Sequence, residues 1–426
     1  MKLGRAVLML AMLASGHLAA QSGQGAATAP AQTASVARGE YLVRAGGCMA
    51  CHTANPSRPF AGGRAMPTRF GTFYTPNITS DRATGIGAWT DAQFVRAMRE
   101  GIGRNGERLY PAFPYTAYTR LTDADVLSMR AYLATLPPVR NTPSRHALRF
   151  PFDQRWLMAA WNWFNFSQGR FVPDSSKGAE WNRGAYLVEA LGHCGQCHTP
   201  RKVLGGLKEN ERLGGATVAG WRAGNLTPER VAGIGAWRDD ELLRYLATGA
   251  APGRAYAIGP MAEVVAMSTH FLSDDDLRAM VRYLRSAPVV GGDSGARPRW
   301  AFGAPGRVDV TALDRTAKRD SGGRLYAAAC ASCHGVTGEG GGRFPSLVHD
   351  PVTGGLGTMN VNNLVLVILY GVRRDTRATP VLMPAFAGEL SDENIATLSN
   401  YLTQQFGDPR ATTRAEDVAR LRAIAQ

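Results

Sequence analysis

All six cysteines of the chain fall into three pairs that share one spacing and one following residue. The pairs read CMACH at 48–52, CGQCH at 194–198 and CASCH at 330–334. The pattern C-x-x-C-H is the attachment signature of c-type haem, because two thiols at this spacing reach the porphyrin and the adjacent imidazole binds the iron. The sequence therefore predicts three covalent haems. The thiols are Cys48, Cys51, Cys194, Cys197, Cys330 and Cys333, and the iron-binding imidazoles are His52, His198 and His334.

Paired cysteines have three other common uses, and each fits this pattern less well. Disulfides that staple an exported protein usually close loops longer than two residues. A redox-active C-x-x-C does not need a histidine directly behind it. A zinc site needs a second ligand pair, and no clear second pair stands near any of the motifs. Three copies in one chain favour haem.

The N-terminus has the features of a secretory signal peptide at residues 1–20. Lys2 and Arg5 precede a short apolar run, which ends at the small residues Ala19 and Ala20. The run is too short to span a bilayer comfortably, so an uncleaved anchor is the less favoured alternative. We therefore expect the mature chain in a periplasm. The net charge of +14 suits contact with anionic lipid or an acidic partner. No nucleic-acid partner is expected, because no basic arm or RNA-binding pattern is present.

The sequence around each cysteine pair repeats. GEYLVRAGGCMACHT (39–53) matches GAYLVEALGHCGQCHT (184–199), and GGRLYAAACASCHG (322–335) is a looser third copy. Each copy predicts a helix ahead of the cysteines. A second unit, TGIGAWTDAQFVRAMREG (84–101), matches AGIGAWRDDELLRYLATG (232–249), with Gly101 and Gly249 as helix C-caps.

A third unit predicts a closing helix in each repeat. It reads LTDADVLSMRAYLATLP (121–137), LSDDDLRAMVRYLRSAP (272–288) and LSDENIATLSNYLTQQF (390–406), each with a Thr or Ser N-cap and acids in the first turn. The apolar run at 362–372 predicts a buried helix.

The order helix, C-x-x-C-H, middle helix, loop and closing helix resembles a class I cytochrome c domain, so an all-α chain of three tandem domains is expected. The expected boundaries are signal peptide 1–20, linker 21–35, domain one 36–140, linker 141–180, domain two 181–290, linker 291–318, domain three 319–408 and an amphipathic tail 409–426.

Two methionines stand where a second axial ligand is needed. A soft thioether opposite histidine suits a low-spin haem and raises its potential. Met383 lies 49 residues after His334 in VLMPAF, and Met261 lies 63 residues after His198 in AIGPMAEV. Both precede a closing helix and adjoin a proline, so both are predicted iron ligands.

The first repeat departs from this pattern. Phe113, 61 residues after His52, stands where methionine is expected, and phenylalanine cannot bind iron. An open sixth position, a water molecule, and a methionine from elsewhere all remain as alternatives. Met66 in a glycine-rich loop and Met98 on the middle helix are the candidate methionines. The histidines outside the motifs, His17, His146, His193, His270 and His349, are expected to be ordinary polar residues.

The three motifs, together with TPNIT (75–79), the repeated GIGAW, YPAFPY (110–115) and GPMAEVV (259–265), resemble the tri-haem cytochrome c subunits of bacterial membrane-bound dehydrogenases. The resemblance covers nearly the whole mature chain. It implies a complex on the outer face of the cytoplasmic membrane, with a large catalytic subunit and a third small subunit. It further implies electron delivery to ubiquinone or another cytochrome. The PAFPY loop favours a molybdenum-dependent aldehyde dehydrogenase as partner, ahead of a quinoprotein or flavoprotein dehydrogenase.

Two segments have more than one interpretation. In the tail, Val418, Leu421 and Ile424 form an apolar stripe that suits either an anionic membrane surface or packing on domain three. The aromatic run WLMAAWNWFNF (156–166) is expected to be a linker helix packed between domains, with docking to a partner or bilayer as the alternative. The chief functional alternative to a relay is a peroxidase-like enzyme that uses an open position on the first haem.

Overall fold

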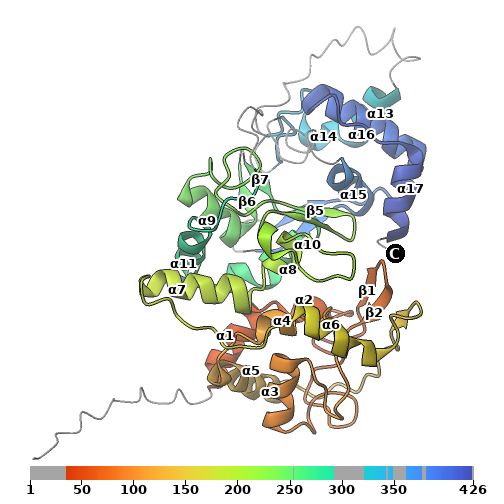
Figure 1. Ribbon diagram of the computed structural model, residues 1–426. Helices are drawn as coiled ribbons and strands as arrows, with labels where there is room; N and C mark the ends of the chain where they lie inside the picture. The colour runs from red at the N-terminus through yellow and green to blue at the C-terminus, as the bar shows by residue number, and fades with distance from the viewer. Residues whose placement is uncertain are drawn as a thin grey trace, which may run out of the picture. The chain divides into compact units, whose positions relative to one another are not determined.

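The computed structural model describes residues 35–252, 254–291, 321–341, 344–348, 361–376 and 380–424. The expected signal peptide, most of the linker 291–318 and His349 lie outside the described residues. The chain from Ala34 onward forms one compact unit, shown in Figure 1. The described part is mostly helical with short two- and three-stranded sheets, which confirms the predicted fold class.

The first repeat begins and ends with helices that pack on each other. Helix α1 contacts α5, and a small sheet of order β1-β2-β3 lies beyond the haem motif. The elements are α1 Val36–Ala45, α2 Cys48–His52, β1 Ala65–Thr68, β2 Gly71–Tyr74, α3 Asp91–Glu100, α4 Tyr115–Tyr118, α5 Asp123–Thr135, β3 Ala147–Leu148, the 3-10 turn η1 Arg155–Leu157 and α6 Met158–Asn165. The segment expected as the linker 141–180 therefore adds a strand to this sheet, because β3 pairs with β2.

The second repeat has the same plan, with α7 packed on α11. Its elements are α7 Ala179–Tyr186, η2 Leu187–Leu191, α8 Gly195–His198, η3 Glu209–Glu211, β4 Ala216–Val218, β5 Trp221–Ala223, α9 Asp239–Thr248, β6 Ala250–Ala251, β7 Ala255–Tyr256, α10 Gly259–Met267, η4 Thr269–Phe271 and α11 Asp274–Leu284.

The third repeat packs α13 on α16 and adds the tail helix to the same core. Its elements are α13 Ser321–Ala329, α14 Ala331–His334, α15 Asn362–Tyr370, β8 Val372–Arg374, β9 Val381–Met383, α16 Asp392–Phe406 and α17 Ala415–Ile424. Val418 and Leu421 of α17 are buried in this core. Of the two interpretations of the tail, a membrane-surface helix or a helix packed on domain three, the structure shows the second.

A glycine lets the first and last helices of each repeat approach closely. A Cβ on Gly39 or Gly184 would lie 1.9 Å from a backbone oxygen of the closing helix, and one on Gly322 would lie 2.5 Å from Cβ of Tyr401. No other residue fits at such a crossing. The glycine that begins each repeated GEYLV-like segment is therefore a packing requirement.

The predicted helix caps are present. Gly101 and Gly249 end α3 and α9 in the left-handed conformation, with φ of 66° and 73°. Thr122, Ser273 and Ser391 cap the closing helices, each accepting a hydrogen bond of 3.2 Å from a backbone N–H three residues on. The buried helix predicted at 362–372 is α15.

The second repeat has one more residue than the first between its initial glycine and its first cysteine. Cys194 follows Gly184 by ten positions, whereas Cys48 follows Gly39 by nine. The structure absorbs the insertion in a π-helical turn, η2, at Leu187–Leu191. Insertion of a single residue into a helix is the usual origin of such a turn, which is often found at functional sites.

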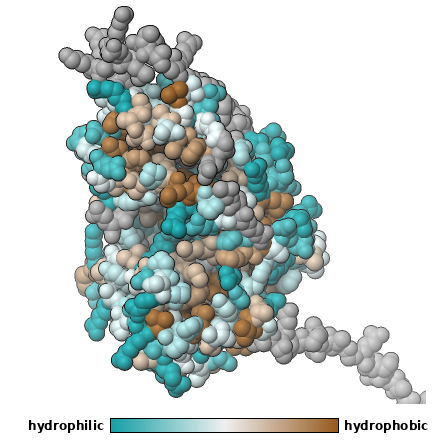
Figure 2. Space-filling view, turned by 180° about the vertical axis from the view of Figure 1, so that it is seen from behind, coloured by the Kyte–Doolittle hydropathy of each residue, from teal (hydrophilic) through white to brown (hydrophobic). Residues whose placement is uncertain are grey.

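The first two repeats share one hydrophobic core. Leu42 and Leu133 of the first repeat and Leu187 and Leu277 of the second belong to a single buried cluster. Residues of the third repeat form a separate cluster around α15 and α16. Figure 2 shows polar and apolar residues interspersed on the side opposite to that of Figure 1. No helix among the described residues is long and apolar enough to span a membrane.

The aromatic run 156–166 contacts both of the first two repeats, as predicted for a linker helix between domains, but three of its aromatic side chains face solvent. Trp156, Trp163 and Phe164 are 70%, 85% and 76% exposed. The inner face of α6 instead carries Asn162, which accepts a hydrogen bond of 2.6 Å from the Tyr115 hydroxyl. The segment therefore turns Asn162, Trp161 and Phe166 toward the protein and Trp163 and Phe164 toward solvent.

Candidate haem sites

The three C-x-x-C-H motifs occupy equivalent places in the three repeats. Each lies directly after the first helix of its repeat and forms or enters a short helix that ends at the histidine: α2, α8 or α14. None of the six cysteines is part of a disulfide. In the second and third repeats, the backbone oxygen of the first cysteine accepts a hydrogen bond of 3.0 Å from the backbone N–H of the motif histidine. Thiols and imidazole are thereby held on one turn of chain.

Each motif histidine uses its ring Nδ1 in the same way. The Nδ1 atoms of His52, His198 and His334 lie 2.8, 2.7 and 3.0 Å from the backbone oxygens of Pro76, Gly224 and Pro345. A carbonyl oxygen only accepts hydrogen bonds, so Nδ1 carries the proton in all three rings. The lone pair is then on Nε2, which is the arrangement that metal-binding histidines show.

Burial favours the neutral imidazole that this role needs. It lowers the pKa of His52, His198 and His334, although in each case the hydrogen bond to the carbonyl oxygen acts in the opposite direction. A protonated imidazole has no lone pair for a metal ion. All three rings are therefore in the state that binds iron.

The loops that supply the carbonyl oxygens are built alike in the first two repeats. Asn77 follows Pro76, and its Oδ1 accepts hydrogen bonds of 2.9 and 2.8 Å from the backbone N–H and hydroxyl of Thr79. Its Nδ2 donates to the oxygen of Val139 at 2.7 Å. This asparagine ties the loop to the chain that follows the closing helix.

The second repeat reproduces the same asparagine contacts. Oδ1 of Asn225 accepts from the backbone N–H and hydroxyl of Thr227 at 2.8 and 2.7 Å. Its Nδ2 donates to the oxygen of Val290 at 2.8 Å. The TPNIT motif alone did not predict this function. The repeated N-x-T spacing, in TPNIT and in GNLT at 224–227, was the available signal.

Burial raises the pKa of the first cysteine of each motif. It raises the pKa of Cys48 and of Cys194 to about 12, and that of Cys330 to about 11. A redox-active C-x-x-C needs a lowered thiol pKa and access to solvent. The raised pKa of Cys48, Cys194 and Cys330 is the opposite of this, while Cys197 and Cys333 are exposed.

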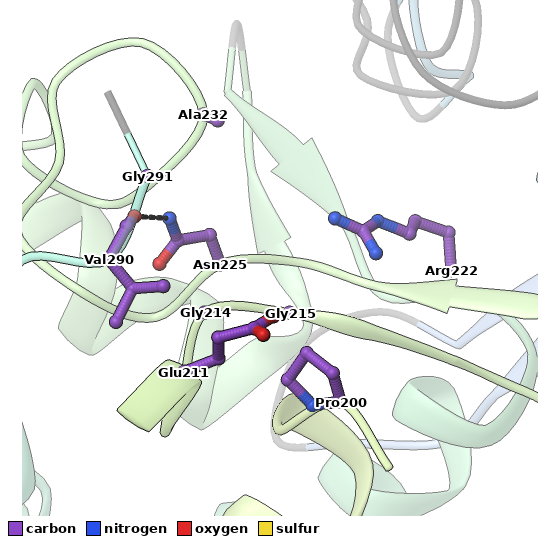
Figure 3. A pocket seen from close by; sticks show the side chains of 9 residues that line it. All are labelled: Pro200, Glu211, Gly214, Gly215, Arg222, Asn225, Ala232, Val290 and Gly291. Atoms are coloured by element: carbon purple, nitrogen blue, oxygen red, sulfur yellow. Dashed lines mark hydrogen bonds between the residues drawn. The ribbon is translucent and has the colours of Figure 1, made fainter. Parts of the chain in front are cut away.

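A cavity of about 460 Å³ lies beside the second motif (Figure 3). Arg222 on β5 and Asn225 line it, and Nε of Arg222 is buried without a hydrogen-bond partner in the described part of the chain. Both the backbone N–H and the carbonyl of Arg222 are bound by the side chain of Asn363, at 2.7 and 3.1 Å. Beside the His198 loop, this unsatisfied guanidinium N–H could donate a hydrogen bond to a carboxylate group, such as a propionate of haem.

The two predicted methionine ligands lie ahead of their closing helices. Met261 is half-buried in the first turn of α10, against a small apolar cluster that includes Ala257 and Tyr245. Met383 ends β9, where it pairs with Val372 of β8. Both remain predicted ligands, Met261 at the start of a helix with Pro260 in its first turn and Met383 at the end of a paired strand.

In the first repeat, Phe113 packs 5.6 Å from the ring of Tyr118, which is itself buried near Cys48 and Cys51. Met66 lies half-buried on β1 opposite Phe73. Met98 lies on α3 in the shared core, 5% exposed. The candidates for the sixth ligand therefore come from different elements of the first repeat.

His193 was expected to be an ordinary polar residue, but it contacts residues near the first motif. It follows the π-helical turn with φ of 39° and stacks edge-on against Tyr118 at 5.5 Å. Its ring also hydrogen-bonds the backbone of Gly46, next to the first motif. His146 accepts a hydrogen bond of 3.1 Å from the backbone N–H of Tyr74, 72 positions away, and Nδ1 of His270 lies 2.9 Å from the oxygen of Val265. His193 thus joins the approach to the first motif to that of the second.

Helix α10 links the second site to both of its neighbours. Glu263 of α10 binds Arg64 through two contacts of 2.8 and 3.0 Å, and Arg64 also donates to the oxygen of Ala50 inside the first motif at 2.5 Å. On the third repeat, buried Arg374 donates to the oxygen of Ala257, just before α10, at 2.9 Å. The Met261 segment therefore contacts both the first motif and the β8–β9 hairpin of Met383.

Two family models match the chain. The cytochrome c model matches residues 36–137, and the model of cytochrome c oxidase, cbb3-type, subunit III matches residues 317–402. These ranges cover the first and third repeats.

Several curated proteins are similar over most of the chain. The fructose dehydrogenase cytochrome subunit of Gluconobacter japonicus is 41% identical over 93% of this chain and 84% of its own length. The cytochrome c subunit of a quinone alcohol dehydrogenase from Gluconobacter oxydans is 35% identical over 92% and 83%. One of the nicotinate dehydrogenase subunits of Pseudomonas putida is 40% identical over 87% of this chain, which spans only 30% of that longer protein.

Proposed function

The chain belongs to the family of cytochrome c subunits of membrane-bound dehydrogenases, and on that premise we propose that it relays electrons through three covalent haems from a catalytic subunit to ubiquinone or another cytochrome. It is an electron-transfer subunit that binds c-type haem. One observation carries the count of three: in every repeat the motif histidine donates Nδ1–H to a backbone oxygen and keeps Nε2 for a metal.

The chain's own residues bind and orient the groups. Cys48 and Cys51, Cys194 and Cys197, and Cys330 and Cys333 form the thioether links, and His52, His198 and His334 bind iron. Met261 and Met383 would each supply a thioether ligand to the iron in the second and third repeats, and Met66 or Met98 would do so in the first. When bound, haem iron supplies one-electron chemistry, cycling between its ferric and ferrous states. Arg222 offers a guanidinium N–H to the second site.

The contacts of α10 favour the second site as the intermediate in the relay. Arg64 holds α10 against the first motif, and Arg374 holds the segment before α10 against the β8–β9 hairpin. Arg64 binds a backbone oxygen inside the first motif and Arg374 binds one four residues before Met261, so they fix the position of these segments relative to each other. Fixed positions between sites suit electron transfer that needs no domain movement.

The partner that supplies the electrons is a catalytic dehydrogenase subunit. We propose a molybdenum-dependent aldehyde dehydrogenase as the first candidate, on the PAFPY loop at 111–115, ahead of a quinoprotein or flavoprotein. The proposed location is the periplasm, with peripheral contact to the outer face of the cytoplasmic membrane and with a third small subunit in the complex. The name of the Gluconobacter oxydans relative supports a quinone acceptor.

The test is reduction of this chain's haem absorption in the complex purified from native membranes. Substrate of the dehydrogenase is expected to reduce the haems in the complex and to leave the isolated chain oxidised. Metal, flavin and quinone-cofactor analysis of the complex then identifies the partner class. Substrate oxidation or peroxide turnover by the isolated chain would contradict a pure relay and favour the peroxidase-like alternative.

A further inference from the structure

Helix α6 carries an unusual distribution of side chains. The outward positions of α6 are Ala159, Ala160, Trp163 and Phe164, and Trp156 of the preceding turn η1 continues them. These positions are three and four residues apart and so lie on one face. Every one is apolar, so this helix exposes the face that a soluble helix normally buries.

The inward face is fixed by polar contacts. Asn162 accepts from Tyr115 at 2.6 Å, and the indole Nε1 of Trp161 donates to the oxygen of Leu204 at 2.8 Å. Asn165 donates back to the oxygen of Trp161 at 2.9 Å. The contacts of Asn162 with Tyr115 and of Trp161 with Leu204 join α6 to the rest of the protein and hold its apolar face outward.

Two loops extend the same surface. The Leu204 contact places the loop 201–206 beside α6, and Val203 and Leu204 on this loop are 82% and 63% exposed. Arg69, in the turn between β1 and β2, donates to the oxygens of Lys202 and Val203. The ring of Phe70 stacks 4.7 Å from Phe152, next to exposed Phe150. We name the exposed side chains Phe150, Trp156, Trp163, Phe164, Val203 and Leu204 the aromatic surface.

Positive charge surrounds the aromatic surface. Residues 69–70, 149–164 and 201–208 contain six Lys or Arg and one acid, Asp153, and of these cations Lys208 is paired with Glu211 at 3.1 Å. The structure pairs neither Arg149 nor Lys202 with a carboxylate among the described residues. An acidic, apolar-centred counterpart is therefore what this surface complements.

We propose that the aromatic surface docks this subunit on an anionic phospholipid bilayer. Tryptophan and phenylalanine partition into the interfacial region of a bilayer, and flanking cations bind anionic headgroups. The aromatic side chains come from a helix and two loop tips, so they insert at one level while α6 lies along the surface. This inference rests on the proposed membrane contact and assigns it to named residues.

The test is flotation of the haem-loaded full chain with vesicles, followed by haem absorbance. Phosphatidylcholine vesicles are compared with vesicles that also contain phosphatidylglycerol. The wild-type chain is expected to float with the anionic vesicles at least tenfold more than with the neutral ones. The double variant W163S/F164S is expected to lose at least tenfold of that binding, and R149Q/K202Q is expected to lose the preference for anionic lipid.

Matched controls keep the test specific. R82Q/R104Q removes two exposed arginines of the first repeat away from the aromatic surface and is expected to bind like wild type. Haem content and circular dichroism check that each variant folds. Equal flotation of W163S/F164S and wild type would overturn the assignment while leaving membrane contact intact. If wild type fails to float, membrane contact fails as well. If W163S/F164S floats normally but no longer purifies with the dehydrogenase, the surface binds the protein partner instead.

Discussion

Tyr41 in the first repeat donates its phenolic proton to Oδ2 of Asp276 in the second repeat, at 2.6 Å and across 235 positions of sequence. The reciprocal contact is present: Tyr186 in the second repeat donates to Oδ2 of Asp125 in the first, also at 2.6 Å. Tyr41 and Tyr186 occupy the same position in the repeated segment GEYLV or GAYLV. The first two repeats therefore bind each other through equivalent residues with exchanged partners.

An arginine completes each pair. Arg183 binds Asp276 at 2.8 and 2.7 Å, and Arg38 binds Asp125 at 2.5 Å. Each carboxylate thus receives hydrogen bonds from an arginine of its own repeat and a tyrosine of the other. Together with the shared core, these contacts make the first two repeats one module.

Replacing Asp276 with asparagine is expected to lower the free energy of unfolding by about 2 kcal/mol, because it removes a charge-assisted hydrogen-bond set and leaves Arg183 without its partner. The measurement is urea unfolding followed by circular dichroism. The matched control is D275N, whose side chain is 90% exposed and which is expected to change stability by less than about 0.5 kcal/mol. Equal stability of D276N and D275N would contradict the module.

The Asp276 contribution is expected to vanish in acid. Burial raises the pKa of Asp276, but hydrogen bonds from Arg183 and Tyr41 outweigh it, and the net pKa lies below its usual value. A carboxylate with a lowered folded pKa contributes its stability above the unfolded pKa of about 4 and loses it as pH falls through the folded pKa. The stability gap between wild type and D276N should shrink from about pH 6 to about pH 3. A gap that does not change over this range would show that the charge of Asp276 is not what stabilises the contact.

Leucine at Met383 or Met261 is expected to abolish one methionine–iron charge-transfer band and to lower the potential of one haem, because a thioether ligand raises that potential. Optical spectra and potentiometric titration measure both effects. M280L is the matched control: Met280 is buried in α11 away from the ligand loops, and the swap conserves volume. Unchanged spectra in M383L and M261L would remove both residues from the proposed ligand set.

For the first haem, M66L is expected to change the spectrum and M98L is not. Met98 is buried in the shared core, and its counterpart in the second repeat is Leu246, which packs on the same core and cannot bind iron. M98L should therefore cost less than about 1.5 kcal/mol and nothing else. Electron paramagnetic resonance distinguishes high-spin from low-spin iron in each variant. A high-spin signal in M98L alone would reverse the assignment, and no change in either would leave water or an open position.

Local signals in the sequence predicted the elements well. The caps at Thr122 and Gly101 depend on one residue and its near neighbours, so the sequence shows them directly. The C-x-x-C-H motifs are local for the same reason. The carbonyl partner of His52 was not predicted, since it lies 24 residues on and is a backbone atom with no side-chain signature.

Contacts between residues far apart in the chain could not be predicted from the sequence. The Tyr41–Asp276 pair depends on how two repeats dock, which no periodicity encodes. The exposure of Trp156, Trp163 and Phe164 in the run 156–166 was not predicted, because apolar composition indicates burial in the average protein. Only the inward contacts of Asn162 and Trp161 show which face of α6 is turned outward.

The central claim is that each of the three motifs attaches one haem. The most direct measurement is a pyridine haemochrome assay on the denatured, exported protein, with iron counted per chain. Three covalent haems per chain are predicted, and two in the C194S/C197S variant. No covalent haem in the denatured wild-type protein would contradict the account from its first motif onward, and a count below three would contradict the equivalence of the three histidine sites.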